Sequence, residues 1–394
     1  MKVEISSRAV GQIKSGSLWI FANEFVTRMA DLKPGEWVEF ESRGQFVGYG
    51  YVNPHSLIAG RILSVRPVTD RKTLLFNLLR EADKKRHAEK LVGSYRAVFS
   101  ESDFLPGLIV DVYEKIVVAQ FNTAGIDQAK TDLTHGLFEI FEPDYIVIRA
   151  DSSVRILEGC EGFVETFRGL NQVEIEEAGE LRNSIVHEGN ISFAADFIGG
   201  QKTGFFLDQR ENRKNLIQNS EGKSVLDLFS YSGGWGLSAL RGKADHVTFV
   251  DQSPSAIKLL ERGLELNQFS TQKVSLVTSD VFDYLKSDSK TFDIVVCDPP
   301  AFVKSKKNLD QAKRAYKKLN LKALEKVKSG GLFYTCSCSY HLSEFDFEQI
   351  LKEIFQESER LGEVVYRGGQ PLDHPWIINR PESRYLKCYC FKVG

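Results

Sequence analysis

Four strand-like runs, each carrying an aspartate at or near its end, constrain the fold of this 394-residue chain more than any other feature. The runs are SVLDL, HVTFVD, KVSLVTSD and FDIVVCD, and their acids are Asp227, Asp251, Asp280 and Asp298. Short aliphatic and β-branched runs that alternate with helical stretches predict a parallel sheet in an α/β fold. Ligands bind at the carboxyl ends of the strands in such a sheet, so the acids predict a nucleotide-binding edge.

The turn after the first run, FSYSGGWG, predicts a close approach between backbone and ligand. Gly233, Gly234 and Gly236 carry no side chain to block it. Asp227 can accept from an ammonium group, and Asp251 can hold the two ribose hydroxyls of a nucleoside. Asp280 has two interpretations that the sequence leaves open: a partner of an adenine amino group, or the N-cap of the following helix.

The DPP loop helps to distinguish between the reactions that such a nucleotide-binding edge could support. Proline restricts its own φ and the residue before it, so Asp298, Pro299 and Pro300 form a stiff platform able to hold a planar base. A methyl-transfer enzyme that uses S-adenosylmethionine needs such a platform, whereas a nicotinamide-dependent oxidoreductase, which has similar acids, does not. The order of motifs therefore favours methyl transfer over hydride transfer.

A later strand, GLFYTCSCS, brings two cysteines to the same edge. Thiols are good nucleophiles when their surroundings favour ionisation, but most free cysteines are small buried residues. We interpret Cys336, deeper in the strand, as buried and Cys338 as the reactive thiol. We expect no metal site, because side chains two residues apart on a strand lie about 7 Å apart, too far for tetrahedral zinc.

Over nearly its whole length the chain resembles the 23S rRNA 5-methylcytosine methyltransferases that carry an N-terminal PUA domain, an RNA-binding module. The strings that carry the resemblance are NPHSLIAGRILS, LPGLIVDVY, GQKTGFFLDQRENR, DLFSYSGGWG, DPPAFVKSKK, TCSCS, and DHP followed by YLK. Some relatives have lysine where this chain has Ala301, which leaves the target nucleotide open. The resemblance implies S-adenosylmethionine as cofactor and 23S rRNA of the large subunit as partner.

The resemblance also implies a mechanism and a site. Cys338 would add to carbon 6 of cytosine, and Asp298 would protonate or polarise the base. The base that removes the carbon 5 proton stays open among Cys336, Tyr340, His341 and water. The expected cofactor-binding residues are Lys202, Thr203, Phe206, Asp208, Arg210, Asp227, Phe229, Tyr231, Gly233, Asp251, Ser253, Asp280, Val281 and Asp298.

Charge is distributed unevenly along the chain. The formal net charge is only −2, yet Lys304, Lys306, Lys307, Lys313, Arg314, Lys317 and Lys318 cluster after the DPP loop with Asp310 as the only acid among them. Such a cluster predicts salt-sensitive phosphate contacts. A second basic group, Lys84, Lys85, Arg86, His87 and Lys90, is more typical of a solvated helix face.

The patterning predicts three domains: a small β-barrel of the PUA type over residues 1–68, a central α+β domain over 73–182, and a Rossmann-like methyltransferase domain with a seven-stranded sheet over 185–394. The N-terminus does not resemble a signal peptide and no apolar run reaches the ~20 residues of a membrane span, so we expect a cytoplasmic protein. A homodimer remains open. Two alternatives also remain: direct methyl transfer to a base nitrogen without a thiol adduct, and a non-catalytic RNA-binding protein.

Overall fold

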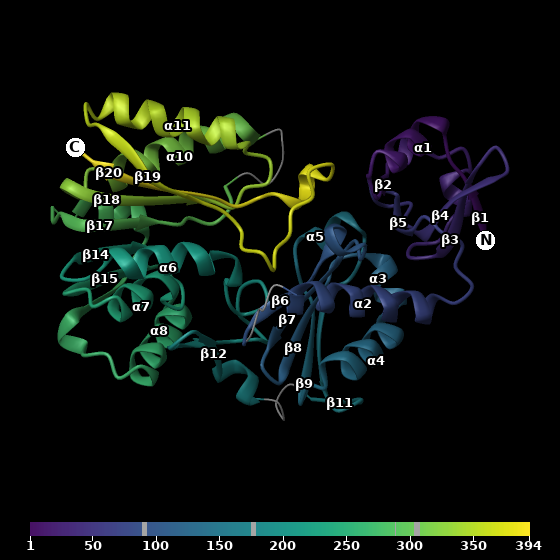
Figure 1. Ribbon diagram of the computed structural model, residues 1–394, viewed down its shortest axis with the longest axis horizontal. Coiled ribbons are helices and arrows are strands. Elements are labelled where there is room, and N and C mark those ends of the chain that lie inside the picture. The colour runs from purple at the N-terminus through teal and green to yellow at the C-terminus, as the bar shows by residue number, and fades with distance from the viewer. Residues whose placement is uncertain (89–92, 175–178, 288, 303–307) are drawn as a thin grey trace. The chain divides into compact units, whose positions relative to one another are not determined.

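The computed structural model describes residues 1–88, 93–174, 179–287, 289–302 and 308–394 (Figure 1). Contacts within the chain divide it into two compact units. Unit 1 comprises Met1–Arg182, Asp196–Phe205 and Leu372–Ser383, and unit 2 comprises Asn183–Ala195, Phe206–Pro371 and Arg384–Gly394. Of the helices in the described part of the chain, none has the length and apolar character that a membrane span requires.

The first part of unit 1 is a five-stranded sheet in the order β1-β3-β4-β5-β2. Its elements are β1 (Lys2–Glu4), α1 (Ser7–Lys14), β2 (Trp19–Ile20), β3 (Trp37–Ser42), β4 (Gln45–Val52) and β5 (Gly60–Ser64), with short 3-10 turns at Ala22–Glu24 and Met29–Asp31. The strings EWVEF and FVGYGYV contribute to β3 and β4. A Cβ on Gly50 would lie 1.8 Å from the carbonyl oxygen of Arg61, so β4 requires glycine where β5 crosses it.

The second part of unit 1 is a six-stranded sheet in the order β11-β10-β9-β8-β7-β6. The strands are β6 (Tyr95–Phe99), β7 (Leu108–Tyr113), β8 (Ile116–Phe121), β9 (Tyr145–Ala150), β10 (Phe163–Arg168) and β11 (Asn171–Val173). The helices are α2 (Arg71–Ala88), α3 (Ala124–Gln128), α4 (Lys130–Phe141) and α5 (Val154–Leu157), with a 3-10 turn at Ser100–Asp103. Gly136 lets α4 approach α2, because a Cβ there would meet Leu79 at 2.9 Å.

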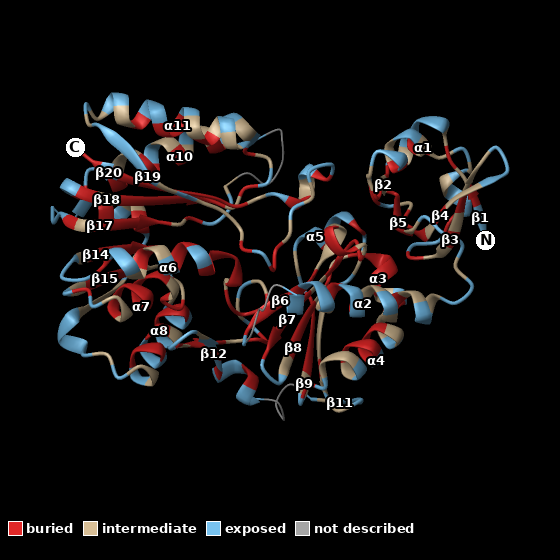
Figure 2. Ribbon diagram, viewed as in Figure 1, coloured by how far each residue is buried: buried red, intermediate tan, exposed pale blue. Residues whose placement is uncertain are grey.

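Unit 1 contains buried ion pairs, and Figure 2 shows that its strands β7, β8 and β9 are largely buried (red). Arg86 binds Asp103 and Arg96 binds Asp111, each at 2.7 Å. Arg86 is 2% exposed. It is therefore not part of a solvated basic face, because the turn at Ser100–Asp103 supplies an acid that the local sequence does not reveal. Lys90, from the same basic group, lies outside the described residues.

Unit 2 contains a two-stranded sheet, β12 (Ser184–Glu188) with β13 (Ile191–Ala195), and a seven-stranded sheet in the order β16-β15-β14-β17-β18-β20-β19. The larger sheet consists of β14 (Ser224–Leu228), β15 (His246–Asp251), β16 (Val274–Thr278), β17 (Phe292–Cys297), β18 (Val327–Ser337), β19 (Gly362–Gly368) and β20 (Lys387–Val393). Five of these strands are parallel, and β20 is antiparallel to both β18 and β19. The order reverses between β14 and β17, the position where open α/β sheets bind ligands.

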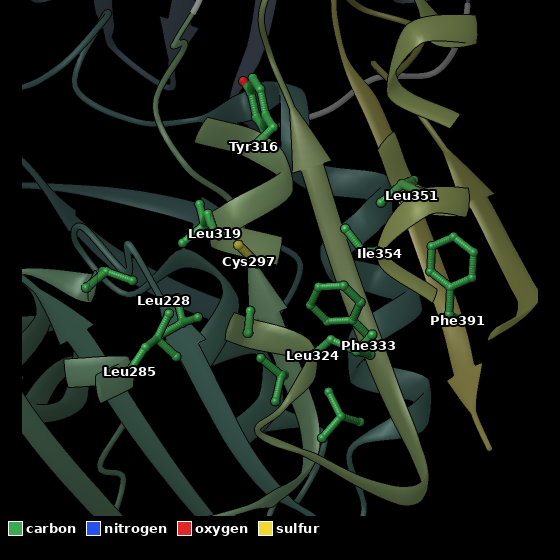
Figure 3. Packing of buried hydrophobic residues seen from close by; sticks show 14 of the residues in the cluster. Leu228, Leu285, Cys297, Tyr316, Leu319, Leu324, Phe333, Leu351, Ile354 and Phe391 are labelled. Atoms are coloured by element: carbon green, nitrogen blue, oxygen red, sulfur yellow. The ribbon is translucent and has the colours of Figure 1, made fainter. Parts of the chain in front are cut away.

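The helices of unit 2 pack on both faces of this sheet. They are α6 (Arg210–Asn219), α7 (Gly234–Arg241), α8 (Pro254–Leu266), α9 (Val281–Ser287), α10 (Leu309–Leu324) and α11 (Glu344–Glu357). Tyr316, Leu319 and Leu324 of α10 share one apolar cluster with Phe333 of β18 and with α11, as Figure 3 shows. On the opposite face α7 comes so close to β15 that a Cβ on Gly236 would overlap the Phe249 ring. Gly236 is thus required by packing, rather than by a ligand as the sequence suggested.

Candidate active site

The loop between β14 and α7 has an unusual backbone. Phe229, Tyr231 and Gly233 have φ values of 61°, 48° and 87°, in the left-handed region that side chains disfavour. Two backbone bonds hold the loop: Ser230 N–H to the carbonyl of Val250 at 3.1 Å and Gly233 N–H to the carbonyl of Ser230 at 2.8 Å. Strained conformations of this kind concentrate at binding sites, because the surrounding structure must hold them in place.

Asp227 is fully buried at the end of β14. Its Oδ2 accepts a hydrogen bond from Gly236 N–H at 2.8 Å, while its Oδ1 is buried with no hydrogen-bond partner among the described residues. Burial raises the pKa of Asp227 well above 3.8; the Gly236 bond opposes this, and the charges of Asp298 and Asp251 add to it. An unused acceptor in a buried carboxyl group fits the ammonium group of an amino-acid ligand.

Asp251 connects two loops. Its Oδ2 accepts from Tyr231 N–H at 2.9 Å and its Oδ1 from Ser253 N–H at 2.8 Å. Each oxygen keeps a further lone pair for a hydroxyl group. The Ser253 side chain caps α8 by accepting from Ala256 N–H at 3.3 Å, so its hydroxyl already has a structural role.

Asp280 is exposed and acts as a helix cap. Its Oδ1 accepts from the N–H groups of Phe282 and Asp283 at 2.8 and 3.2 Å. The helix-cap interpretation of this residue is therefore confirmed, and only one of its two oxygens takes part in these bonds. Val281, the next residue, is 3% exposed and belongs to the apolar cluster.

Asp298 directly follows the last residue of β17 and accepts hydrogen bonds from two side chains. The indole N–H of Trp235 and the side-chain amide of Gln209 each donate to its Oδ2 at 2.9 Å. Pro299 is buried and Pro300 is exposed. Neither donor was singled out from the sequence, although Trp235 lies in the glycine turn and Gln209 in the GQKTGFFLDQR string. The carboxylate is thus held in one orientation at the switch point of the sheet.

Cys336 and Cys338 have different environments. Cys336 is fully buried and lies opposite Cys388 in the β18–β20 pair. Its pKa is raised well above 9.0, by burial first and then by Cys388, which keeps the thiol neutral. Cys338 follows the last residue of β18 and is half-buried. Because Cys297 pairs with Thr335, Asp298 and Cys338 leave neighbouring parallel strands at the same edge.

The residues expected to wall the cofactor pocket fall in both units. Thr203, in unit 1, is fully buried, and its hydroxyl is 2.9 Å from that of Tyr113 and donates to Asp111 at 2.5 Å. Lys202, also in unit 1, has φ 51°. The others belong to unit 2. There the Phe206 ring contacts Tyr231 edge-on at 5.4 Å, the Tyr385 hydroxyl donates to Asp208 at 2.6 Å, and Arg210 lies 3.7 Å from Glu188.

Two residues near the site were missed in the sequence. Ser230 is 4% exposed, and its Oγ is buried with no hydrogen-bond partner among the described residues. Lys387, at the start of β20, is 5% exposed and donates to the carbonyls of Ser339 and Leu342 at 2.8 and 2.7 Å. Its place in the YLK string was the only available signal, because no local pattern puts a C-terminal strand beside β18.

Comparison with known proteins supports this description of the fold. The model of the PUA-like domain matches residues 3–65, and that of the S-adenosylmethionine-dependent methyltransferases matches residues 167–377. Two relatives, from Aliivibrio fischeri and Vibrio vulnificus, are each called ribosomal RNA large subunit methyltransferase I. They are 34% and 33% identical to this chain over 384 and 387 residues, and 95% of each chain is covered.

Solved structures show the same fold. A Streptococcus mutans protein described as a SAM-dependent methyltransferase superimposes with a TM-score of 0.82 at 24% identity, and a methyltransferase complexed with SAH with 0.83 at 24%. Both alignments cover 100% of both chains. The open sheet, with its left-handed loop and the acids at its switch point, thus has a methyltransferase fold. The match over residues 3–65 adds an N-terminal PUA-like domain. The chain belongs to the S-adenosylmethionine-dependent methyltransferase family, and its cofactor is S-adenosylmethionine.

Proposed function

We propose that this protein methylates carbon 5 of a cytosine in the 23S rRNA of the large ribosomal subunit, through a covalent adduct with Cys338. The names of its relatives support the ribosomal RNA substrate. The observation that carries the cytosine chemistry is the half-buried thiol of Cys338 at the same sheet edge as Asp298. Methyl transfer to an exocyclic or ring nitrogen needs no thiol at that place.

The proposed cofactor site follows from the free acceptors. Asp227 Oδ1 would take the ammonium group, Asp251 the ribose hydroxyls, and Asp280 with Val281 the adenine. Phe206, Phe229, Tyr231, Gly233 and Ser253 would line the pocket, with Asp208 and Arg210 at its walls. The resemblance also implies Lys202 and Thr203, which belong to unit 1, as cofactor-binding residues. The buried, unpartnered oxygens of Asp227 and Ser230 support this placement, because an unsatisfied buried acceptor costs about 1–3 kcal/mol that a ligand can recover.

The chain's own residues would act as follows. S-adenosylmethionine supplies an electrophilic methyl group. The Cys338 thiolate adds to carbon 6 of cytosine, and the new S–C bond makes carbon 5 nucleophilic. Asp298, oriented by Trp235 and Gln209, holds the pairing edge of the flipped base. After carbon 5 gains the methyl group it loses its proton to a base, and the electrons of that C–H bond expel the thiolate.

The phosphate-binding surface is smaller than the sequence suggested. Lys313 binds Asp346 at 2.6 Å, and Lys317 binds Glu353 and Glu357 at 3.0 Å each. These acids come from α11, so they were not visible in the sequence around the lysines. Arg314 and Lys318 remain exposed on α10, and Lys304, Lys306 and Lys307 lie outside the described residues. We propose Arg314 and Lys318 as RNA contacts.

We further propose that residues 1–68 bind RNA, that 73–182 form a central domain, and that 185–394 catalyse the reaction. The match of the PUA-like model to residues 3–65 supports the first assignment, and that of the methyltransferase model to 167–377 supports the last.

The decisive experiment traps the adduct. RNA with 5-fluorocytosine at the target should remain bound to the protein through denaturing electrophoresis, because fluorine cannot leave as a proton. Cys338→Ala should abolish both the adduct and 5-methylcytosine formation, while Cys336→Ala and Cys160→Ala, a change in unit 1, should retain the adduct. Full methylation by Cys338→Ala would contradict covalent catalysis and favour direct transfer to a base nitrogen. A protein that binds RNA but methylates nothing would be the non-catalytic alternative.

A further inference from the structure

The backbone that follows Cys338 is fixed by a buried lysine. Lys387 begins β20 and pairs with Ser337, the last residue of β18. Its ammonium group donates to the carbonyl of Ser339, the residue after Cys338, at 2.8 Å and to that of Leu342 at 2.7 Å. The Lys387 ammonium group thus holds the Cys338–Leu342 loop by two hydrogen bonds from the neighbouring strand.

This position is costly for a lysine. Burying an ammonium group requires compensation by charge or hydrogen bonds, and an ammonium carries three donors. The carbonyl oxygens of Ser339 and Leu342 accept hydrogen bonds from this ammonium group. A structural role alone would be filled by a neutral donor without this cost.

Two further charged groups, Glu344 and Arg384, act on the charge of Lys387. The Glu344 carboxylate is itself held by Arg367 and Arg384, each at 2.5 Å. Burial lowers the pKa of Lys387 to about 8; Cys338 and Glu344 oppose this, and Arg384 adds to it. At neutral pH the lysine therefore remains mostly charged, and a negative charge on Cys338 favours this charged form.

On the α10 side, the Tyr316 hydroxyl bonds to the two serines that flank Cys338. Its hydroxyl is 2.9 Å from that of Ser339 and accepts from Ser337 Oγ at 3.1 Å. Burial, followed by the charge of Cys338, raises the pKa of Tyr316 to about 12, so the phenol stays neutral. Lys387 therefore brings a cation from β20 to the carbonyl of the residue after Cys338, and Tyr316 brings a neutral hydroxyl to the two flanking serines.

We infer that Lys387 is a positioning residue for Cys338: its ammonium group fixes the Cys338–Leu342 loop and favours the thiolate form of the cysteine. This inference rests on the proposed role of Cys338 as nucleophile. In the ionisation step the S–H bond breaks and the proton passes to water, while the negative sulfur gains the field of the neighbouring cation. No oxidant or additional reactant is needed.

The test measures the ionisation of the Cys338 thiol rather than the rate of methyl transfer. The rate at which iodoacetamide alkylates Cys338 is followed against pH in the full chain, with the modified peptide quantified by mass spectrometry. Lys387→Met should raise the alkylation pKa of Cys338 by about 1–3 units, the usual effect of an opposite charge at close range. Lys387→Arg, which keeps the charge, should stay close to the parent. Cys160, in unit 1, serves as the internal reference thiol, and Lys392→Met, exposed on the same strand, as the matched control.

Each outcome decides the inference. An unchanged Cys338 pKa in Lys387→Met, with Cys160 reacting as in the parent, overturns it even if Cys338→Ala is inactive. If Lys387→Met does not fold, a rise in Lys387→Arg as large as that expected for the neutral variant overturns it instead. Conversely, a shifted pKa together with full methylation by Cys338→Ala would reject the proposed function and leave the charge effect of Lys387 standing.

Discussion

Asp227 and Gly236 share a single hydrogen bond: the backbone N–H of Gly236 reaches one carboxyl oxygen at 2.8 Å, and the other oxygen is buried without a partner among the described residues. The bond joins the end of β14 to the first turn of α7, directly beneath the left-handed loop. An acid in this position destabilises the cofactor-free protein, and that cost can be measured.

The first prediction concerns pH and stability. Because the pKa of Asp227 is raised in the folded chain, the unfolded state loses its proton near 3.8 while the folded state keeps it. The free energy of unfolding therefore falls as pH rises above about 4, until the folded carboxyl also ionises. Asp227→Asn mimics the protonated acid, so it should raise the melting temperature of the cofactor-free protein at pH 7. The gain should disappear towards pH 4, and a gain that is constant with pH would contradict the assignment.

A second prediction concerns the cofactor. Asp251→Ala should weaken S-adenosylmethionine binding by roughly 1.5–3 kcal/mol, the scale for losing hydrogen bonds to a charged acceptor. Isothermal calorimetry provides the measurement. The control is Asp283→Ala, which removes an exposed acid of α9 that pairs with Lys286 and should leave the affinity unchanged. Equal affinity in Asp251→Ala would remove this residue from the ribose site.

The third prediction compares two arginines of α2. Arg86→Met should destabilise the protein by about 3–5 kcal/mol, because it leaves the buried Asp103 carboxylate without its main cation. Arg80→Met removes an ion pair to Glu139 whose side chains are 58% and 56% exposed, so it should cost no more than about 1 kcal/mol. Urea denaturation distinguishes the two variants. Similar losses of unfolding free energy in both variants would show that burial does not increase the contribution of the Arg86–Asp103 pair to stability.

A fourth prediction tests the RNA surface. Arg314→Glu with Lys318→Glu should weaken binding of ribosomal RNA fragments and lower the salt dependence of binding by about one unit of slope per lost phosphate contact. Affinity for S-adenosylmethionine should not change. Lys243→Glu, which reverses an exposed charge just after the end of α7, is the control and should leave the slope unchanged. If the slope is unaltered, this face of α10 is only solvated.

Much of the site could be predicted because its signals are local. Asp227, Asp251 and Asp298 each end a short apolar run, and the strand ladder brings them to one edge. The burial of Cys336 also followed from its depth in the strand. For Asp280, the helix-cap interpretation that the sequence left open is the one that the hydrogen bonds support.

The remaining features depend on contacts between distant segments. Lys313 and Lys317 of α10 are neutralised by acids of α11, more than 30 residues later in the chain. Lys387 reaches the Cys338 loop only because β20 inserts between β18 and β19 as an antiparallel strand. Local patterning specifies that a segment is a strand, but not which strand it joins.

The discontinuity of unit 1 has a consequence for synthesis of the protein. Leu372–Ser383 belongs to unit 1, although almost all of unit 2 precedes it in the chain. Asp373 supplies its carbonyl to Arg86 at 3.1 Å and its carboxylate to Arg96 N–H at 3.1 Å, and both partners are buried. On the ribosome, the first 182 residues emerge long before these acceptors exist. The N-terminal part of unit 1 therefore lacks these two acceptors until Leu372–Ser383 has been translated.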